Sequence, residues 1–376
     1  MVMHVVAVLP GGLEQEGCKE LAKLGATRLK ASRSLISFEA DMSCLYRIHL
    51  RARLPFRFLR EIARFKCNSP ESLYEGVQKA FDWCNWLKPS FSFRVDASGS
   101  CSELRHTHYS ALQVKNALVD LQKNLWDHRS IVNLRNPDIC LHLHLFNDEA
   151  VLSIDGCGKS LHRRGYRAAL GSAPLKENLA CGLMRLTEWN GFKPLVDPLC
   201  GSATFLIEAA LDYLGIAPGL NQSFIINNWY DYDLDLWNIE KEIAKKTKNS
   251  FENMPLIIGC ERDSRIAEQA RKNVAEAGLA DNIKIHNLDY KDFHLPDESG
   301  TIVCNPPYGI RVGFDEDLET FYSELGYFLK SNASNWQLWM LSGNSHLTRF
   351  LRMKSSRKIP INNGGIDCRW LNYSIN

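Results

Sequence analysis

The stretch Leu195-Val-Asp-Pro-Leu-Cys-Gly-Ser-Ala-Thr204 determines how the second half of this 376-residue chain folds. A short apolar strand ends at Val196, Asp197 follows it, and a turn of small residues leads into an apolar helix that begins at Thr204. In nucleotide-binding α/β folds, such a turn lets the backbone approach a ligand and points helix N–H groups at it. The stretch therefore predicts a ligand loop between a strand and a helix, without the full glycine fingerprint.

From Gly171 onward, the pattern predicts regular alternation of helices and short apolar strands. Strands are predicted at residues 194–196, 255–260, 283–286, 301–304 and 337–341. Helices between successive strands are typical of a parallel sheet that is covered by helices on both faces. Ligands of such folds lie at the carboxyl ends of the strands.

Two more acids follow predicted strands in the same way as Asp197. Glu261 comes after the strand that ends at Cys260, where a carboxylate can accept both hydroxyls of an adenosine ribose. Asp289 follows the next strand and can accept from an adenine N6 amine. A single acid of this kind is also typical of a helix N-cap or a solvated turn. Three acids in order, each at a strand end, favour a nucleoside-binding site.

The next strand end, Ile302-Val-Cys-Asn-Pro-Pro-Tyr-Gly309, has the most specific pattern in the chain. The two prolines fix an extended turn. The side-chain oxygen of Asn305 and the carbonyl of Pro306 can both accept from one planar amine, and Tyr308 offers a ring on which a base can stack. A rigid Pro-Pro turn without further function is the alternative.

The first half of the chain predicts two small α+β units. Strand, helix, strand and helix within residues 1–66 are typical of a ferredoxin-like unit. Residues 67–167 contain a long helix at 107–126 and two strands joined by a turn at Asn147 and Asp148. A hydrophobic content of 45% and a net charge of +2 exclude a disordered chain. No apolar run approaches the ~18 residues of a membrane-spanning helix.

Positive charge is concentrated in the first half. Residues 1–170 hold 24 Lys and Arg against 17 Asp and Glu, whereas residues 171–376 hold 21 against 26. The stretch from Leu45 to Lys66, which we call the basic stretch, has seven basic residues, one acid and interleaved phenylalanines. Both a polyanion-binding surface and a solvated sheet face produce this pattern. Candidate phosphate contacts are Arg47, Arg51, Arg53, Arg57, Arg163, Arg164 and Arg167.

The 12 cysteines are scattered singly, with no C-x-x-C pair. This spacing favours a reducing cytoplasm and argues against a metal site. Most of the cysteines lie in apolar or helical contexts, and we expect Cys200 and Cys304 to be packing residues.

The motifs DPLCGSAT, GCERD, LDY and NPPYG resemble those of the S-adenosylmethionine (AdoMet)-dependent methyltransferases that act on exocyclic nitrogens of bases. The segments LHRRGYRAALGSAPLKENLA, IEAALDYLGIAPGLN and NNGGIDCRWLNY look like those of the RlmL-type 23S rRNA guanine-N2 methyltransferases. The similarity covers essentially the whole chain. It implies a ferredoxin-like domain at 1–66, an RNA-binding THUMP domain at 67–167 and a Rossmann-like class I methyltransferase domain at 168–376. It also implies a single catalytic domain, without the second fused methyltransferase of the longer bacterial proteins.

The resemblance also implies roles for individual residues. Asn305, Pro306 and Tyr308 match the target-amine site, and residues 172–178 match the motif beside the methionine end of AdoMet. The family usually reads GSGT where this chain has Ala203; if the backbone there needs a positive φ, Ala203 costs about 1 kcal/mol. The AdoMet-binding residues matched by position are Asp197, Gly201, Ser202, Thr204, Glu261 and Asp289.

Together, these patterns predict a cytoplasmic enzyme that methylates N2 of a guanine in RNA, with 23S rRNA as the first choice, and that needs neither metal nor membrane. Methylation of guanine N2 in tRNA and of adenine N6 are alternatives. An inactive THUMP-type RNA-binding factor, impaired by Ala203, is a third.

Overall fold

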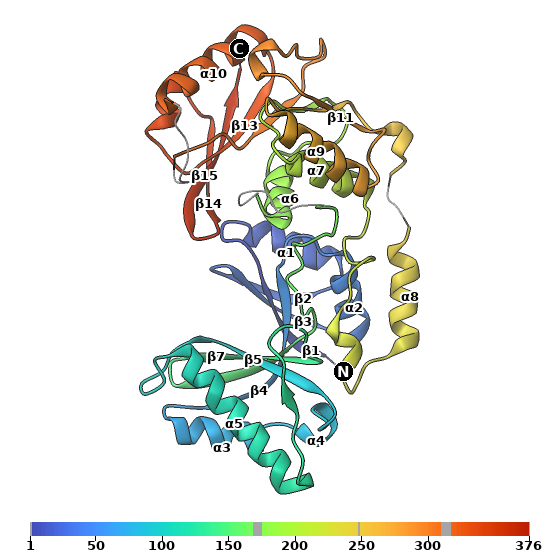
Figure 1. Ribbon diagram of the computed structural model, residues 1–376, viewed down its shortest axis with the longest axis vertical. Helices are drawn as coiled ribbons and strands as arrows, with labels where there is room; N and C mark the ends of the chain where they lie inside the picture. The colour runs from blue at the N-terminus through green and yellow to red at the C-terminus, as the bar shows by residue number, and fades with distance from the viewer. Residues whose placement is uncertain (1, 168–174, 247–248, 310–316, 376) are drawn as a thin grey trace.

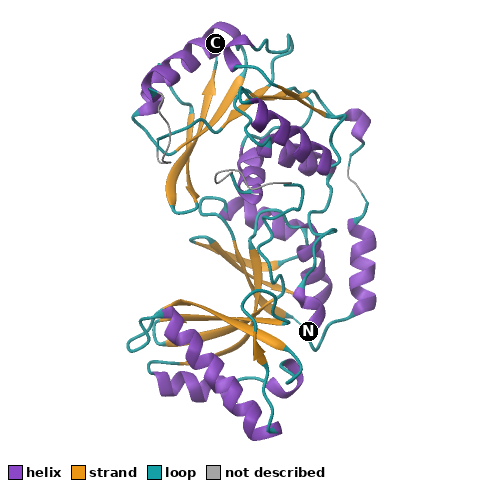
Figure 2. Cartoon of the chain, viewed as in Figure 1, coloured by secondary structure: helices purple, strands orange, loops and turns teal. Residues whose placement is uncertain are grey.

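The computed structural model describes residues 2–167, 175–246, 249–309 and 317–375. Its strands form two sheets, with helices packed around them; the first reaches from the middle to the lower end of the view, and the second lies toward the upper end (Figures 1 and 2). Buried apolar side chains form one continuous cluster that includes residues of both sheets. Among the described residues, no helix is both long and apolar enough to cross a membrane.

The first sheet runs without interruption through the predicted ferredoxin-like and THUMP domains. The link is β4, which pairs with β1 on one side and with β8 on the other, both antiparallel. The strands follow the order β2 (Thr27–Ser32), β3 (Leu35–Ala40), β1 (Met3–Val8), β4 (Arg57–Lys66), β8 (Glu149–Asp155), β7 (Ile139–Phe146), β5 (Ser92–Gly99) and β6 (Ile131–Val132). The ferredoxin-like architecture is confirmed, but β2 and β6 were not predicted, because β2 is an exposed edge strand and β6 has only two residues.

One helix of the first half differs from what its sequence indicates. The N-cap Ser69 followed by Pro70 predicts a helix that continues to about Trp86, but the helix ends at Lys79, and a separate short helix follows at Trp83–Trp86. The indole N–H of Trp83 donates to the carbonyl of Val77 at 2.7 Å, which folds the chain back at this point. The helices are α1 (Glu14–Lys23), α2 (Met42–Arg51), α3 (Pro70–Lys79), α4 (Trp83–Trp86) and α5 (Thr107–Trp126).

The five strands predicted for the second sheet pair in parallel as expected, but the sheet as a whole is mixed. Its last two strands form a hairpin that was not predicted, and β15 runs antiparallel to both β13 and β14. The other strands pair in parallel. The order is β11 (Ile283–His286), β10 (Ile257–Cys260), β9 (Leu195–Asp197), β12 (Thr301–Cys304), β13 (Gln337–Ser342), β15 (Ile366–Ser374) and β14 (Arg357–Asn363).

Helices α6, α7, α9 and α10 accompany this sheet, whereas α8 packs against α2 of the first domain (Figure 1). The chain between α7 and β10 returns to the first half, where the N–H of Gly219 donates to the carbonyl of Leu50 at 2.9 Å. The bounds are α6 (Glu177–Leu186), α7 (Thr204–Leu214), α8 (Leu234–Ala244), α9 (Ser264–Glu276) and α10 (Leu318–Asn332), with one-turn 3-10 helices η1 (Ile225–Asn228), η2 (Phe251–Asn253), η3 (Tyr290–Asp292) and η4 (Leu347–Leu351).

Candidate active site

The loop after β9 has the geometry of a ligand loop. Helix α7 begins at Thr204 without a side-chain cap, so its first backbone N–H groups are available to a ligand. Gly201 has a φ of 51°, and a Cβ added there would meet no atom within 4 Å. The residue faces open space beside the helix N-terminus, as close approach of a cofactor requires.

Ala203 lies in the left-handed region of backbone space, with a φ of 63°. The positive φ on which the cost of Ala203 depends is therefore present. An L-residue in this conformation costs roughly 1–2 kcal/mol, and the Ala203 side chain is fully buried.

Asp197 is buried at the end of β9, and its carboxylate accepts from the N–H of Leu199 at 3.0 Å. Burial raises the pKa of Asp197 to about 8; the hydrogen bond from Leu199 lowers it, and the charge of Glu261 raises it. The carboxyl group of Asp197 lies at the start of the loop that contains Gly201 and can accept a hydrogen bond from a donor group of a ligand.

Glu261 and Asp289 lie at the ends of neighbouring parallel strands. The carboxylate of Glu261 accepts from the N–H of Asp263 at 2.9 Å. Asn287 ties the two loops together, because its amide donates to the carbonyl of Glu261 at 2.9 Å. Asp289 caps η3 by accepting from the N–H of Lys291 at 3.0 Å. Since β9, β10 and β11 are adjacent, the three predicted acids lie along one sheet edge.

Asn305 follows β12, the neighbour of β9 on the other side. Its Oδ1 is buried and has no hydrogen-bond partner among the described residues. A buried acceptor left unpaired costs about 1–3 kcal/mol, so this oxygen suits a donor brought by a ligand. Pro306 is buried beside it. The hydroxyl of Tyr308 accepts from Nδ2 of Asn363 in β14 at 3.2 Å, which orients the tyrosine ring.

Arg167 was predicted to bind RNA, but the structure places it beside the ligand loop. Its guanidinium donates to Oγ1 of Thr204 at 2.9 Å and pairs with Glu177 at 3.2 Å. Of the predicted segment 172–178, residues 172–174 lie outside the described residues. Asn178 is fully buried, and its amide donates to the carbonyl of Leu54 at 2.9 Å.

Five arginines of the first half pair with acids of the second half. Much of the positive charge of the first half is therefore neutralised by acids of the second half within the protein. The pairs are Arg47–Glu240 at 2.6 Å, Arg53–Asp212 at 3.0 Å, Arg60–Asp231 at 2.6 Å, Arg164–Glu208 at 3.9 Å and Arg167–Glu177 at 3.2 Å.

These contacts contradict the predicted RNA-binding roles of Arg53 and Arg164. Both side chains are only 4% exposed, so neither can reach a phosphate. Arg47 and Arg57 are partly exposed, but Arg47 is held by Glu240, and Arg57 lies 3.5 Å from Asp155. Arg163 is exposed and Arg51 half-buried, and no ion pair of either is found within the described ranges. These two remain candidates.

Sequence reasoning missed the residues that the β14–β15 hairpin contributes. Asn363, which orients Tyr308, was quoted only as part of a family-like segment. The sequence did contain a signal for the basic residues near this hairpin. Residues 349–358 hold five basic residues and no acid, although the second half of the chain is acidic overall.

Family models match the whole succession of domains. An RlmL ferredoxin-like domain matches residues 4–59, a THUMP domain matches residues 67–155, and an RMKL-like methyltransferase domain matches residues 164–372. The last match covers more than half of the chain.

Individual relatives agree with these models. The protein slr0064 of Synechocystis sp., named as an RNA methyltransferase, is 40% identical over 370 residues, which are 98% of this chain and 96% of that protein. The ribosomal RNA large subunit methyltransferase K/L of Cellvibrio japonicus is 37% identical over 388 residues, and the chain spans 52% of its length. The chain thus spans about half the length of the K/L relatives it matches.

A solved structure gives the same result for the fold and the cofactor. SMU.472, a methyltransferase complexed with SAH (S-adenosyl-L-homocysteine), has a TM-score of 0.86 and 28% identity, with 100% of this chain and 98% of that chain covered. The open loop at Gly201 and the acids of the neighbouring strand ends fit such a cofactor. The chain therefore belongs to the RMKL-like family, with ferredoxin-like and THUMP domains before the catalytic domain, and it is an AdoMet-dependent RNA methyltransferase.

Proposed function

We propose that the chain methylates the exocyclic N2 amine of a guanine in RNA, with 23S rRNA as the substrate. The observation that carries the proposal is the buried Oδ1 of Asn305, which lacks a hydrogen-bond partner among the described residues. The N–H groups of a base amine would satisfy this acceptor. The names of the K/L relatives, which refer to RNA of the large ribosomal subunit, support 23S rRNA.

In this proposal, AdoMet lies along the strand ends from β9 to β11. When bound, it supplies a methyl group on a positively charged sulfur, already activated for transfer to nitrogen. The loop at Gly201 allows close approach, Glu261 accepts the ribose hydroxyls, and Asp289 contacts the adenine. The contacts proposed from this chain are Asp197, Gly201, Ser202, Thr204, Glu261 and Asp289.

Asn305, Pro306 and Tyr308 orient the target base. The side-chain oxygen of Asn305 and the carbonyl of Pro306 accept the two amine hydrogens, which directs the nitrogen lone pair out of the base plane. Tyr308, oriented by Asn363, stacks on the base after it has left its own stack. Alignment of this kind is the main contribution that the protein makes to catalysis.

In this proposal, each of the three predicted domains has its own role. Residues 1–66 form the ferredoxin-like domain, residues 67–167 form the THUMP domain that helps to select the RNA, and residues 168–376 carry out the transfer. We propose the cytoplasm as the compartment.

A second candidate acceptor is the N6 amine of adenine. Two oxygen acceptors, on Asn305 and Pro306, can hold any planar amine, and nothing in their arrangement selects guanine. The RNA can equally be tRNA, because the described contacts do not separate the two RNA classes.

Mass spectrometry of nucleosides separates these candidates. RNA from a strain that lacks the gene is compared with wild-type RNA, after 23S rRNA and tRNA have been purified separately. The proposal predicts that N2-methylguanosine falls in the 23S rRNA digest and is unchanged in tRNA. A loss of N6-methyladenosine, or a loss confined to tRNA, would overturn it.

A further inference from the structure

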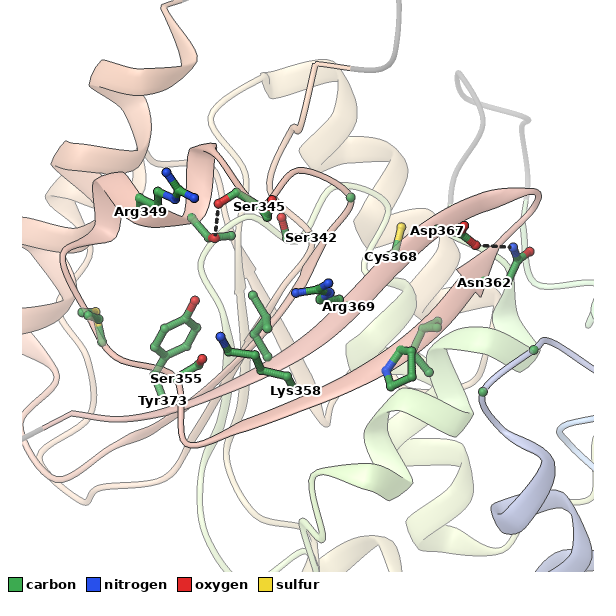
Figure 3. Close-up of a pocket in the computed structure, with 18 of the residues that line it drawn as sticks. Ser342, Ser345, Arg349, Ser355, Lys358, Asn362, Asp367, Cys368, Arg369 and Tyr373 are labelled. Carbon is green, nitrogen blue, oxygen red and sulfur yellow. Dashed lines mark hydrogen bonds between the residues drawn. The ribbon is translucent and has the colours of Figure 1, made fainter.

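A cavity of about 1250 Å³ opens beside the target-amine site, between the β14–β15 hairpin, η4 and the first domain (Figure 3). Gly343, which lines the cavity, is in direct contact with Tyr308, because a Cβ added to Gly343 would lie 3.0 Å from the tyrosine ring. Cys368 and Ser342 also line this end. One end of the cavity therefore lies next to Tyr308, one of the residues proposed to hold the target base.

The strand pattern of the hairpin sends its basic side chains into this cavity. Lys358 pairs with Leu371 across the hairpin, and Pro360 pairs with Arg369, so these four residues share one face. Figure 3 shows Lys358 and Arg369 rising from that face into the cavity. The opposite face is covered, since Trp370 packs against Phe205 of α7 and stacks on Trp339.

Positive charge dominates the lining of the cavity. None of its five basic side chains takes part in an ion pair with another described residue, unlike most arginines of the basic stretch. Its two carboxylates are already engaged, since Glu14 accepts from the N–H groups of Gly12 and Ser34, and Asp367 accepts from Asn362. We call the five cations the basic groove: Arg33, Arg349, Lys354, Lys358 and Arg369.

The two walls of the groove are held together by backbone contacts. The N–H of Asn362 in β14 donates to the carbonyl of Gly11 in the first domain at 2.9 Å. Gly12 has a φ of 95°, and a Cβ there would lie 2.2 Å from the carbonyl oxygen of Pro360. Only glycine fits this junction, which joins the first domain to the hairpin beside the cavity that Arg33 also lines.

We infer that the basic groove binds the RNA strand that flanks the target nucleotide, with backbone phosphates on Arg33, Arg349, Lys358 and Arg369. Arginine and lysine side chains without internal partners are the groups that bind phosphates. Ser345 and Ser355 also line the groove and can donate to phosphate or to a ribose hydroxyl. The inference rests on RNA being methylated at Asn305, but it does not depend on which base or which RNA is modified.

The test is a binding titration with the full chain and a fluorescein-labelled single-stranded oligoribonucleotide of mixed sequence, repeated over a range of salt concentrations. The variant is Lys358→Glu/Arg369→Glu. The matched control is Lys284→Glu/Lys330→Glu, which makes the same charge change at two exposed lysines of the catalytic domain outside the groove. SAH affinity, measured by calorimetry, reports whether each variant is folded. Lys358→Gln/Arg369→Gln replaces the first variant if it fails to fold.

Loss of two phosphate contacts should lower the salt slope of RNA affinity by about 1.4, because each single-strand contact contributes about 0.7. Affinity at moderate salt should fall roughly tenfold or more, while SAH affinity stays at the wild-type value. An unchanged salt slope, or an equal loss in the control, would overturn the inference. This readout involves no methyl transfer, so it can fail while the guanine-N2 proposal holds, and the reverse is also possible.

Discussion

Asp289 is the acid proposed to contact the adenine of AdoMet, and its carboxylate also caps η3. We expect Asp289→Ala to weaken SAH binding by about 1.5–3 kcal/mol, since a hydrogen bond to a charged group is lost. Calorimetry measures this directly. Asp292→Ala, an exposed acid of the same 3-10 turn, is the control and should bind SAH as the wild type does. Equal affinity in the two variants would remove Asp289 from the site.

The buried carboxyl group of Asp197 makes the stability of the protein depend on pH. Because burial raises the pKa of Asp197 from 3.8 to about 8, its protonated form contributes stability that is complete below pH 4 and is lost as the pH rises to about 8. Replacement by Asn, which keeps the acceptor for Leu199, removes this loss. Asp197→Asn should therefore become more stable relative to wild type between pH 4 and pH 8, by a few kcal/mol at most.

Thermal denaturation of the ligand-free protein across this pH range checks the prediction. Asp263→Asn serves as a control, because contacts with Arg265 hold the pKa of Asp263 below its ordinary value. The stabilisation from the Asp263 carboxylate is complete above the ordinary pKa of an aspartate and is lost only below it, so the stability of this variant relative to wild type should stay constant between pH 4 and pH 8. A difference for Asp197→Asn that stays constant with pH would show that its carboxyl is not buried in protonated form.

At the scale of elements, a substitution in the loop between β9 and α7 should affect SAH binding much more than it affects the stability of the fold. Gly201→Ala adds a Cβ at a φ of 51° where the protein leaves open space, so we expect a stability cost near 1 kcal/mol but more than tenfold weaker SAH binding. Gly278→Ala is the matched control, with a φ of 73° and no atom within 4 Å of the added Cβ, at the end of α9. Similar SAH affinities in both variants would place the cofactor elsewhere.

Elements with strong local patterns could be predicted from the sequence, and those that depend on tertiary partners could not. Helix α7 and strands β11 and β12 match the prediction residue for residue, since each combines an apolar run with clear end signals. The β14–β15 hairpin was missed, because it depends on tertiary contacts that the local sequence does not show. Trp370 of β15 packs against Phe205 and Trp339, which are distant in the sequence.

The same distinction applies to the candidate site. Strand ends followed by acids or by Asn305 are visible in the sequence, because local order alone places them at one sheet edge. The RNA-binding arginines were harder to assign, because charge composition does not show which cations already have partners. Arg53 belongs to the basic stretch, but its partner is Asp212, which lies 159 positions further along the chain and could not be identified from the local sequence.

At the scale of the whole molecule, buried ion pairs join the first half to the catalytic domain. Glu20 of α1 accepts from the N–H groups of Arg53 and Leu54 and pairs with Arg185 of α6 at 2.8 Å. We expect Glu20→Ala to destabilise the protein by about 3–5 kcal/mol, because it leaves buried donors without an acceptor. The midpoint of urea denaturation measures the effect.

Glu16→Ala in the same helix is the matched control. Glu16 pairs with Lys19, whose side chain is 67% exposed, and an exposed pair contributes at most about 1 kcal/mol. A loss of stability for Glu20→Ala as small as that for Glu16→Ala would mean that the interface between the halves does not depend on this carboxylate.

The measurement that tests the central claim most directly is methylation in vitro. Purified wild-type protein and Asn305→Ala are incubated with AdoMet and with 23S rRNA from a strain that lacks the gene, and the nucleosides are analysed by mass spectrometry. The account predicts N2-methylguanosine with the wild type and none with Asn305→Ala, although the variant binds SAH with nearly wild-type affinity. Wild-type turnover by Asn305→Ala, or a methylated nucleoside other than N2-methylguanosine, would contradict it.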